Sequence, residues 1–406
     1  MGDALLTYLS TRLAPVKPSA SAWVSQAARQ LRAKGHDVID MGLGEPDFVT
    51  PEHIIDAAHQ AAKNGETKYP PNDGTVAMKQ AVIAKFARDN QLEAKAEEIL
   101  VSNGAKQIIF NALMASLEVN SEVLLCAPYF GQYKDMVLIL GGQAKEIQCH
   151  AGNDFLVSPA DLEQAITKNT RWVILNSPSN PAGASYSAEQ LKELGDVLKR
   201  HPHVMVMADE IYEHIVFDDF KFVSFASACP ELRDRTLIVN GVSKAYAMTG
   251  WRIGYCLGPP ELIAGMNKVQ SQISSGACSI AQAAAAQALT GPQDCVTEFR
   301  EAFERRRNLV VDAIKKIDGL SLEAPRGAFY AFVGCDDYIG TKTPAGDTIS
   351  NDVEFAQFIL EDANVATVPG SAYGLSPYFR LSTATSDDIL ATAMTRIAES
   401  TTKLIR

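Results

Sequence analysis

The chain has 406 residues, of which 47% are hydrophobic and 21% are charged, and its formal net charge at pH 7 is −11. This length supplies a large core and predicts two domains, while the acidic balance argues against a nucleic-acid partner and fits a soluble enzyme. The seven cysteines are scattered without a C-x-x-C pair, so we predict neither a disulfide framework nor a metal site. The start of the chain lacks a signal-peptide pattern, and no apolar run is long enough for a membrane, which together predict a cytoplasmic protein.

The N-terminal part of the chain predicts a helix, a short strand and a glycine-rich turn. Apolar residues recur at helical spacing from Ser21 to Lys34, and residues 38–41 are typical of a short strand. The turn GLGEPDF at 42–48 follows, and by itself it predicts only a loop. Two further helices are predicted on either side of the loop KYPPNDG at 68–74.

A strand, a glycine and a helix follow one another at 99–107. The apolar run at 99–101 leads through SNGAKQ into a long helix, and the free N–H groups at a helix start attract anions. Many such turns bind nothing, so this signal is weak alone. Lys106 strengthens it, because a cation does not stabilise a helix N-terminus and is better explained by an anionic ligand. The alternative is a solvated lysine.

Three more apolar strands are followed by chemically distinctive residues. The strands are predicted at 122–126, 172–175 and 204–208. Phe130 follows the first and could be a core residue. Asn180 lies in the turn SPSNPAG after the second. Asp209 closes the third, where a buried carboxylate is costly unless it is paired; the alternative is a helix N-cap.

The alternation of strands and helices predicts an α/β protein with a mostly parallel sheet wrapped by helices. Ligands of such sheets bind at the carboxyl ends of the strands. Asn180, Asp209 and Lys244 each follow an apolar run. We therefore expect these three side chains at one edge of the sheet.

The stretch from Leu237 to Leu257, LIVNGVSKAYAMTGWRIGYCL, contains a lone lysine between two apolar strands. Lys244 among small and apolar residues loses solvation, which favours the free amine that can attack a carbonyl group. Ser243 and Arg252 could together hold a phosphate. The alternative is a lysine that reaches solvent and an arginine paired with a surface carboxylate.

The C-terminal part predicts a smaller α+β unit. Helical patterns run from Pro259 through the alanine-rich stretch 280–289, and a long charged helix over 298–316 is predicted to bridge two domains. Short strands are predicted at 327–332, 365–370 and 378–382. Arg380 lies in the last of these; the default interpretation of one arginine is a surface residue. A helix-like segment was also predicted at Glu213-His214.

The predicted domain organisation has three parts. Residues 1–50 form an N-terminal arm and part of a small domain. Residues 51–295 form a large domain that binds the ligand. Residues 296–406 complete the small domain and include the interdomain helix. The boundary at 295 follows the change from strand–helix alternation to the mixed C-terminal pattern. The share of residues 1–50 in the small domain is implied by the resemblance that the next motif shows.

Residues 243–255, SKAYAMTGWRIGY, resemble the cofactor-lysine signature of class I aminotransferases, which are pyridoxal 5'-phosphate enzymes of fold type I. More narrowly, the chain resembles the bacterial aspartate/prephenate aminotransferase branch. The resemblance extends from about Pro18 to Ser382 and includes several motifs in the same order. It implies a large domain with a mostly parallel sheet, a smaller α+β domain built from both chain ends, and a homodimer whose active sites are shared across the interface.

The resemblance implies a role for each motif residue in cofactor binding. Lys244 would bind pyridoxal 5'-phosphate covalently and act as general base and acid, and Asp209 would pair with the protonated ring nitrogen. Asn180 and Tyr212 would contact the phenolic oxygen. The residue at Phe130 is commonly Trp in the family and stacks on the ring. The phosphate would be held by Gly104, Ala105, Lys106, Ser243, Arg252 and, from the neighbouring subunit, Tyr69.

The resemblance also implies the substrate contacts. Arg380 would grip the α-carboxylate of the amino acid, with help from Asn180 and the N–H of Gly44. The distal carboxylate would meet Lys106. Ser19 and Ser21 would assist, and Arg12 could add charge. Aspartate or another dicarboxylic donor and a 2-oxo acid such as 2-oxoglutarate are therefore expected.

Several alternatives stay open at this point. The same branch includes enzymes for aromatic amino acids, prephenate or alanine. β-Lyases and decarboxylases share the fold and its lysine. A regulator with an aminotransferase-like domain would need a DNA-binding module, for which few residues precede the first motif, and the acidic charge also argues against it.

Overall fold

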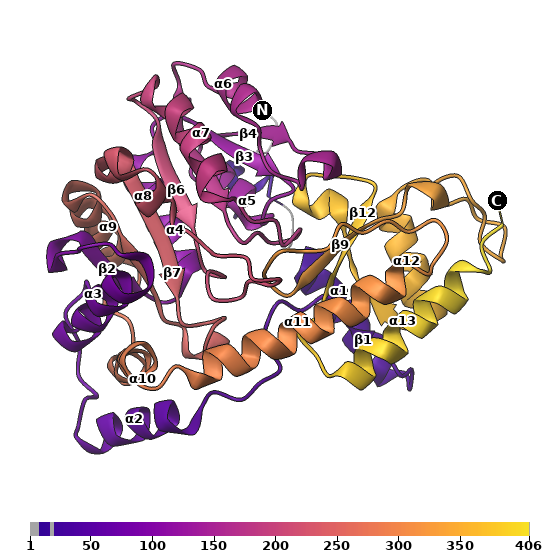
Figure 1. The fold of residues 1–406 in the computed structure, drawn as a ribbon, viewed down its shortest axis with the longest axis horizontal. Coiled ribbons are helices and arrows are strands. Elements are labelled where there is room, and N and C mark those ends of the chain that lie inside the picture. Colours follow the sequence, from indigo (N-terminus) through magenta and orange to yellow (C-terminus); the bar gives the residue numbers. More distant parts are fainter. Residues whose placement is uncertain (1–7, 17–19, 406) are drawn as a thin grey trace, which may run out of the picture.

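A seven-stranded sheet forms the centre of the computed structural model, which describes residues 8–16 and 20–405 (Figure 1). The strand order is β2-β8-β7-β6-β5-β3-β4. In that order the strands are Ile99–Ser102, Gly254–Leu257, Thr236–Gly241, Met205–Asp209, Thr170–Asn176, Glu122–Ala127 and Gln143–Gln148. Strand β8 pairs antiparallel with both its neighbours, and every other pair is parallel. The prediction of a mostly parallel α/β sheet is confirmed.

Helices cover both faces of this sheet, which explains why its strands are largely apolar, except for the polar and mostly exposed edge strand β4. Successive side chains of a strand point to opposite faces, so Leu237 and Val239 pack with one group of helices and Ile238 with another. One face is covered by α4, α5 and α9, which span Ala105–Ser116, Gln132–Ile139 and Pro260–Ile273. The other is covered by α2, α3, α6, α7, α8 and α10, which span Glu52–Lys63, Val76–Asn90, Pro159–Ala165, Ala188–Lys199, Phe225–Ala228 and Ser279–Thr290.

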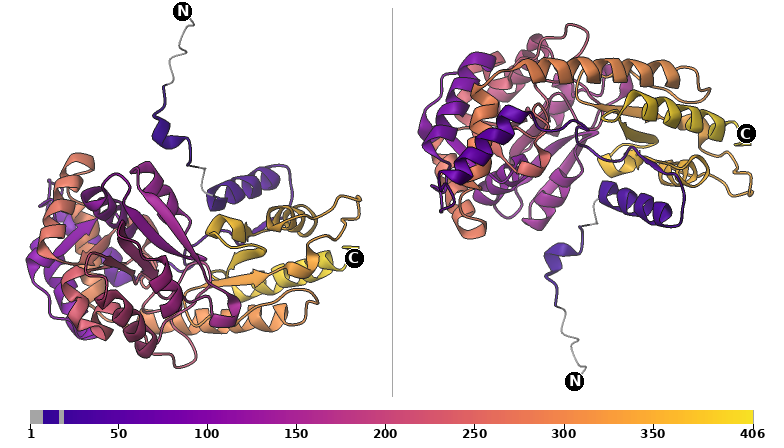
Figure 2. Two further views of the ribbon diagram at one scale, coloured as in Figure 1. Left: turned by 90° about the horizontal axis from the view of Figure 1, so that it is seen from above. Right: turned by 90° about the horizontal axis from the view of Figure 1, so that it is seen from below.

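A smaller layer is built from both ends of the chain, as predicted. Its antiparallel sheet has the order β11-β12-β9, with strands Val368–Pro369, Tyr378–Ser382 and Tyr330–Gly334. Strand β1, Ile39–Asp40, pairs in parallel with β10, Val365–Ala366. Helix α1, Ala20–Ala33, therefore lies beside the C-terminal strands β10 and β11 (Figure 2). Helices α12, Asp352–Ala363, and α13, Asp387–Thr401, belong to the same layer and also contact β10.

Helix α11, Asp294–Ile314, runs from the large sheet to the smaller layer (Figure 1). Its Arg306 is buried and donates to both carboxylate oxygens of Asp47, at 2.8 and 3.0 Å. The neighbouring Arg307 donates to both oxygens of Asp218, each at 2.7 Å. These paired hydrogen bonds hold α11 against the loop that follows β1 and against the loop that follows β6. The predicted helix at 298–316 was misplaced, because Pro292 and the acidic Asp294 mark its start further upstream.

Three predicted elements differ from the structure. Glu213 and His214 lie in a turn instead of a helix, and the Glu213 side chain is turned inward to an ion pair with buried Lys85. The strand predicted from Gly327 starts at Tyr330, because Ala328 has a left-handed φ of 56°. The strand predicted at 365–370 is two strands, β10 and β11, which belong to different sheets.

The remaining regular elements are short 3₁₀ helices. These are Thr11–Leu13, Ala96–Glu98, Ala151–Asn153, Pro230–Arg235, Thr249–Trp251, Asp336–Tyr338 and Gly370–Tyr373. Within residues 8–16 and 20–405, no helix has both the length and the apolar character needed to cross a membrane.

Candidate active site

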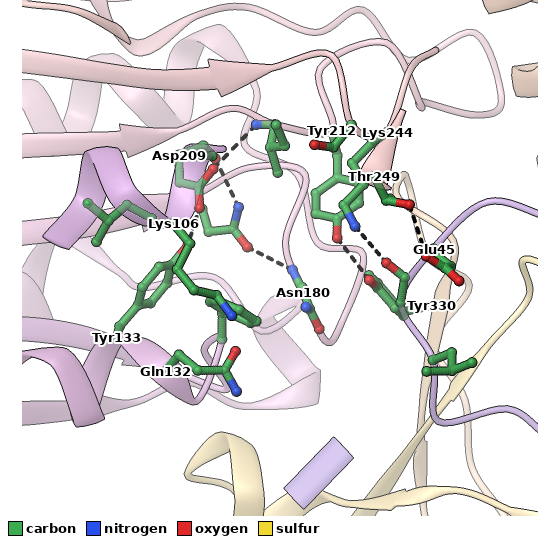
Figure 3. Close-up of a pocket in the computed structure, with 18 of the residues that line it drawn as sticks. Glu45, Lys106, Gln132, Tyr133, Asn180, Asp209, Tyr212, Lys244, Thr249 and Tyr330 are labelled. Atoms are coloured by element: carbon green, nitrogen blue, oxygen red, sulfur yellow. Dashed lines mark hydrogen bonds between the residues drawn. The ribbon is translucent and has the colours of Figure 1, made fainter. Parts of the chain in front are cut away.

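A cavity of about 400 Å³ opens where the carboxyl ends of the central strands face the smaller layer (Figure 3). It brings together eleven residues that the sequence singled out: Gly44, Ala105, Lys106, Phe130, Asn180, Asp209, Tyr212, Ser243, Lys244, Arg252 and Arg380. These residues come from the carboxyl ends of five strands of the large sheet and the segments that follow them, from the loop after β1, and from β12. The cavity is therefore in the place expected for a ligand of a parallel sheet.

Lys244 follows β7 and projects into the cavity (Figure 3). Its ammonium nitrogen donates a 2.6 Å hydrogen bond to the backbone oxygen of Gly44 and lies 5.8 Å from the centre of the Tyr212 ring. Burial, followed by the charge of Arg380, lowers the pKa of Lys244 to about 8. An appreciable fraction of this lysine is consequently the free amine at neutral pH, which is the form that attacks carbonyl groups.

Asp209 is the last residue of β6 and is buried under the same cavity. Its carboxylate accepts hydrogen bonds from the Tyr133 hydroxyl and, at 3.4 Å, from the N–H of Ile211. Burial raises the pKa of Asp209 to about 6, against the opposing effect of the Tyr133 hydrogen bond. The N-cap alternative is wrong, since a turn follows Asp209 in place of a helix. This carboxylate is mostly ionised at pH 7 and can pair with a cation.

The start of α4 forms an anion cradle with Arg252. Gly104 has φ 90°, and a Cβ atom there would lie 2.5 Å from an Arg252 guanidinium nitrogen. A Cβ atom at Gly254 would lie 2.3 Å from the backbone nitrogen of Ala105. Both positions thus require glycine so that the arginine and the helix start can approach each other. With no acidic residue in the first turn of α4, the cradle suits a phosphate.

Arg380 lies on β12 with only 3% of its surface exposed. Its terminal nitrogens donate to the Asn180 side-chain oxygen at 2.9 Å and to the Gly42 backbone oxygen at 2.6 Å. Within the described residues, its buried Nε has no hydrogen-bond partner. A guanidinium with a spare buried donor at the wall of a cavity is suited to a carboxylate ligand.

The charges around the cavity favour an anionic ligand. Its described lining includes the cations Lys106, Lys244, Arg252 and Arg380, against the carboxylates of Glu45 and Asp209. Burial, and next the charge of Arg252, lowers the pKa of Lys106. Clustered positive charge in a cleft concentrates anions. A ligand with a phosphate and carboxylates would match this arrangement.

Comparison with known proteins identifies the family that has this site. The sequence model of the family described as "Aminotransferase class I and II" matches residues 36–397. The chain belongs to the class I and II aminotransferases. The resemblance found in residues 243–255 is confirmed, and with it the prediction of a transaminase.

Characterised aminotransferases resemble the chain over nearly its whole length. An aspartate aminotransferase of Rhizobium meliloti is 51% identical over 395 residues, which cover 97% of this chain and 96% of that protein. An aspartate/prephenate aminotransferase of Cereibacter sphaeroides is 48% identical over 97% of this chain and 98% of its own length. The crystal structure of the Rhizobium meliloti aspartate aminotransferase superposes with a TM-score of 0.96 at 50% identity, covering 98% of this chain and 100% of that one.

A more distant relative has been solved with a dicarboxylate. The aspartate aminotransferase of Thermus thermophilus, solved with maleate, has a TM-score of 0.90 and 38% identity, and the match covers 97% of this chain and 100% of the other. The fold is therefore that of the aspartate aminotransferases.

Of the other four residues predicted to act in this aminotransferase, Gly104 and Tyr69 are described and do not belong to the cavity lining. Gly104 lies behind Arg252 in the cradle. Tyr69 is 95% exposed on the loop after α2. Ser19 lies outside the described residues, and the same holds for the side chain of Ser21, whose backbone belongs to α1.

The aminotransferase cavity also contains residues that the sequence analysis did not assign. They include Glu45, Gln132, Tyr133, Thr249 and Tyr330. The Thr249 hydroxyl donates to the Glu45 carboxylate at 2.9 Å, so the two residues are joined within the cavity lining. Tyr133 could have been suggested by its place three residues after Phe130, in the first turn of α5, which follows β3. Tyr330 gave no signal, because the run GAFYAF reads as a core strand.

Proposed function

We propose that the chain is a pyridoxal 5'-phosphate-dependent aminotransferase that moves an amino group between a dicarboxylic amino acid, aspartate first, and a 2-oxo acid such as 2-oxoglutarate. One observation carries this proposal. A single cavity gathers a lysine with a pKa of about 8, a buried carboxylate, a helix start backed by arginine, and a second arginine with a spare donor. Family membership agrees with it.

The residues present fit pyridoxal 5'-phosphate. The cradle of Gly104, Ala105, Ser243 and Arg252 would hold its phosphate, and the absence of acidic residues from α4 supports that assignment. Lys244 would bind it covalently. When bound, the cofactor supplies an electron-accepting ring that stabilises negative charge on the substrate's α carbon.

Other side chains would orient the cofactor ring. Asn180 and Tyr212 would donate to its phenolic oxygen, and Phe130 would pack on its face. Asp209 would hold the proton of the ring nitrogen. Raising the pKa of that nitrogen by three units takes about 4 kcal/mol, which a close carboxylate in a buried site can supply.

The chain's own residues would carry out binding and proton transfer. Arg380 and the N–H of Gly44 would hold the α-carboxylate of the amino acid. Lys244 would then remove the proton from the α carbon and later return a proton, as general base and acid. Asp209, Tyr212 and Arg380 are buried, and limited access of water strengthens the charged contacts that they make.

Lys106 would select dicarboxylic substrates. Its ammonium nitrogen lies 5.5 Å from the centre of the Phe130 ring, inside the cavity lining. A substrate's distal carboxylate could pair with it, and the serines at 19 and 21 would assist. The names of the Rhizobium meliloti and Cereibacter sphaeroides relatives, and the maleate in the Thermus thermophilus structure, support a dicarboxylic ligand.

We expect Lys106→Ala to lower kcat/KM for aspartate by about tenfold to a hundredfold, the effect of one lost charge-assisted hydrogen bond. The value for alanine, which lacks the distal carboxylate, should change by less than about threefold because its binding does not use that bond. Steady-state kinetics with both donors measure the ratio. Lys134→Ala, which removes an exposed lysine paired with Glu146, is the control and should leave the ratio unchanged. An unchanged ratio in Lys106→Ala would contradict the assignment.

The reaction type is tested by product analysis. Purified protein given aspartate and 2-oxoglutarate should form glutamate and oxaloacetate in equal amounts. Ammonia with pyruvate would instead indicate a β-lyase on the same fold. A preference for aromatic amino acids or prephenate over aspartate would indicate the other activity of this branch.

The proposed enzyme is a homodimer with shared active sites. The exposed ring of Tyr69 supports this, because a large aromatic side chain with 95% exposure is typical of a contact surface. Tyr69 would reach the phosphate bound to the neighbouring subunit. The domain division at residues 50 and 295 and the cytoplasmic location also stay predictions.

A further inference from the structure

Tyr330 contacts three groups of the proposed active site at once. It begins β9 and is only 1% exposed. Its hydroxyl lies 2.8 Å from the Tyr212 hydroxyl, and the Arg380 guanidinium lies 4.5 Å from the centre of its ring (Figure 3). A Cβ atom at Gly44 would lie 2.5 Å from the same hydroxyl. This tyrosine therefore fills the space between the groups proposed to bind cofactor and substrate.

The direction of the Tyr212–Tyr330 hydrogen bond follows from counting protons. A phenol hydroxyl has one proton to donate and lone pairs to accept. If Tyr212 donates its proton to an anionic phenolic oxygen of the cofactor, its own oxygen can only accept from Tyr330. The proton of Tyr330 must then point to Tyr212, and both rings are buried, so water does not compete.

We propose that Tyr330 is a positioning residue, whose hydroxyl donates to Tyr212 and thereby directs the proton of Tyr212 to the cofactor, while its ring supports Arg380. This inference rests on the proposed function. Hydrogen bonds in a chain strengthen one another, so a Tyr212 that accepts from Tyr330 is a better donor. The ring face attracts the guanidinium and limits its movement.

This arrangement predicts a spectroscopic effect. The nitrogen that would join Lys244 to the cofactor carries a proton, and the negative charge of the phenolic oxygen attracts this proton. A strong donor to that oxygen reduces this attraction, so the proton leaves at lower pH. Removing the Tyr330 hydroxyl weakens the donor and should raise the pH at which the proton leaves.

The test uses full-length Tyr330→Phe loaded with pyridoxal 5'-phosphate and titrated by absorbance. We expect the midpoint of the pH-dependent absorbance change to rise by about half to one pH unit, the size expected for one buried hydrogen bond. Affinity for maleate should stay within about twofold, because the phenylalanine ring still packs on Arg380. Tyr330→Leu, without a ring, should shift the midpoint and also weaken maleate binding by about fivefold or more.

Two controls separate positioning from general destabilisation. Tyr246→Phe removes another buried tyrosine hydroxyl, which donates to Gln293 at 2.7 Å outside the cavity lining, and its midpoint should equal that of the wild type. In a Tyr212→Phe background, the Tyr330→Phe change should add little further shift, because the two hydroxyls act in series.

The outcomes are distinguishable. If Tyr330→Phe has the same absorbance midpoint as the wild type, the positioning role of Tyr330 is wrong. It is also wrong if Tyr330→Phe shifts the midpoint equally with and without the Tyr212 hydroxyl. Neither result would contradict the proposed function. If the wild-type protein with pyridoxal 5'-phosphate shows no absorbance change that depends on Lys244, the proposed function itself fails.

Discussion

Replacement of Lys244 by alanine should lower the rate of aspartate–2-oxoglutarate transamination by about 10⁴-fold or more. The change removes the only amine proposed to join the cofactor and also the group proposed to move the α-proton, a transfer that alone contributes about 10² to 10⁴. The measurement is single-turnover kinetics followed by absorbance, which reports the covalent link and the chemical step together. Circular dichroism checks that the variant is folded.

Lys244→Arg serves as the matched control for charge. It keeps a cation close to Gly44, but its guanidinium does not supply a free amine at any pH in the working range. We expect the same loss as for alanine. If Lys244→Ala kept both its turnover and the absorbance of the covalent link to the cofactor, the proposed function would be wrong.

Asp209→Asn should lower kcat by about a thousandfold, with a smaller change in the affinity for cofactor. Without the carboxylate, the proposed support for the proton on the ring nitrogen is lost. A fall of three units in the pKa of that nitrogen corresponds to an increase of about 4 kcal/mol in the activation free energy. Asparagine keeps the size of the side chain, so packing under the cavity is preserved. Steady-state kinetics at several cofactor concentrations separate binding from catalysis.

Tyr133→Phe is the graded comparison for Asp209→Asn. It leaves the carboxylate in place and removes one of the hydrogen bonds that the carboxylate accepts, so a loss of about tenfold or less is expected. If Asp209→Asn stayed within tenfold of the wild type, the carboxylate would not be the partner of the ring nitrogen.

Sequence reasoning was most successful for residues that directly follow apolar strands. Asp209 and Lys244 were located because Asp209 ends β6 and Lys244 lies three residues after β7, and the carboxyl ends of parallel strands share one edge. The motif at 243–255 then identified the family, which the comparisons confirm. The local sequence pattern was enough to place these two residues at the edge of the sheet, because each strand determines where the residues at its end lie.

Contacts between distant segments could not be read from the sequence. Tyr330 and Tyr212 are 118 positions apart, and Arg380 and Asn180 are 200 apart, so no periodicity links them. The pattern of Tyr330 is that of any buried strand residue, and its hydroxyl acquires a role only when β9 packs against the loop after β6. The direction of β8 was likewise hidden, because burial on both faces looks the same in either direction.

The two residues proposed to act at the reacting carbon and at its carboxylate are attached to different sheets. Lys244 is attached to the seven-stranded sheet, whereas Arg380 is attached to the three-stranded one. Neither sheet alone therefore sets the distance between the amine proposed to bind the cofactor and the arginine proposed to hold the α-carboxylate. Under these proposed roles, an amino acid would connect the two sheets, and its binding energy would favour the arrangement in which both contacts are made. An amine without an α-carboxylate would lack the contact with the smaller sheet, and we expect it to react more slowly.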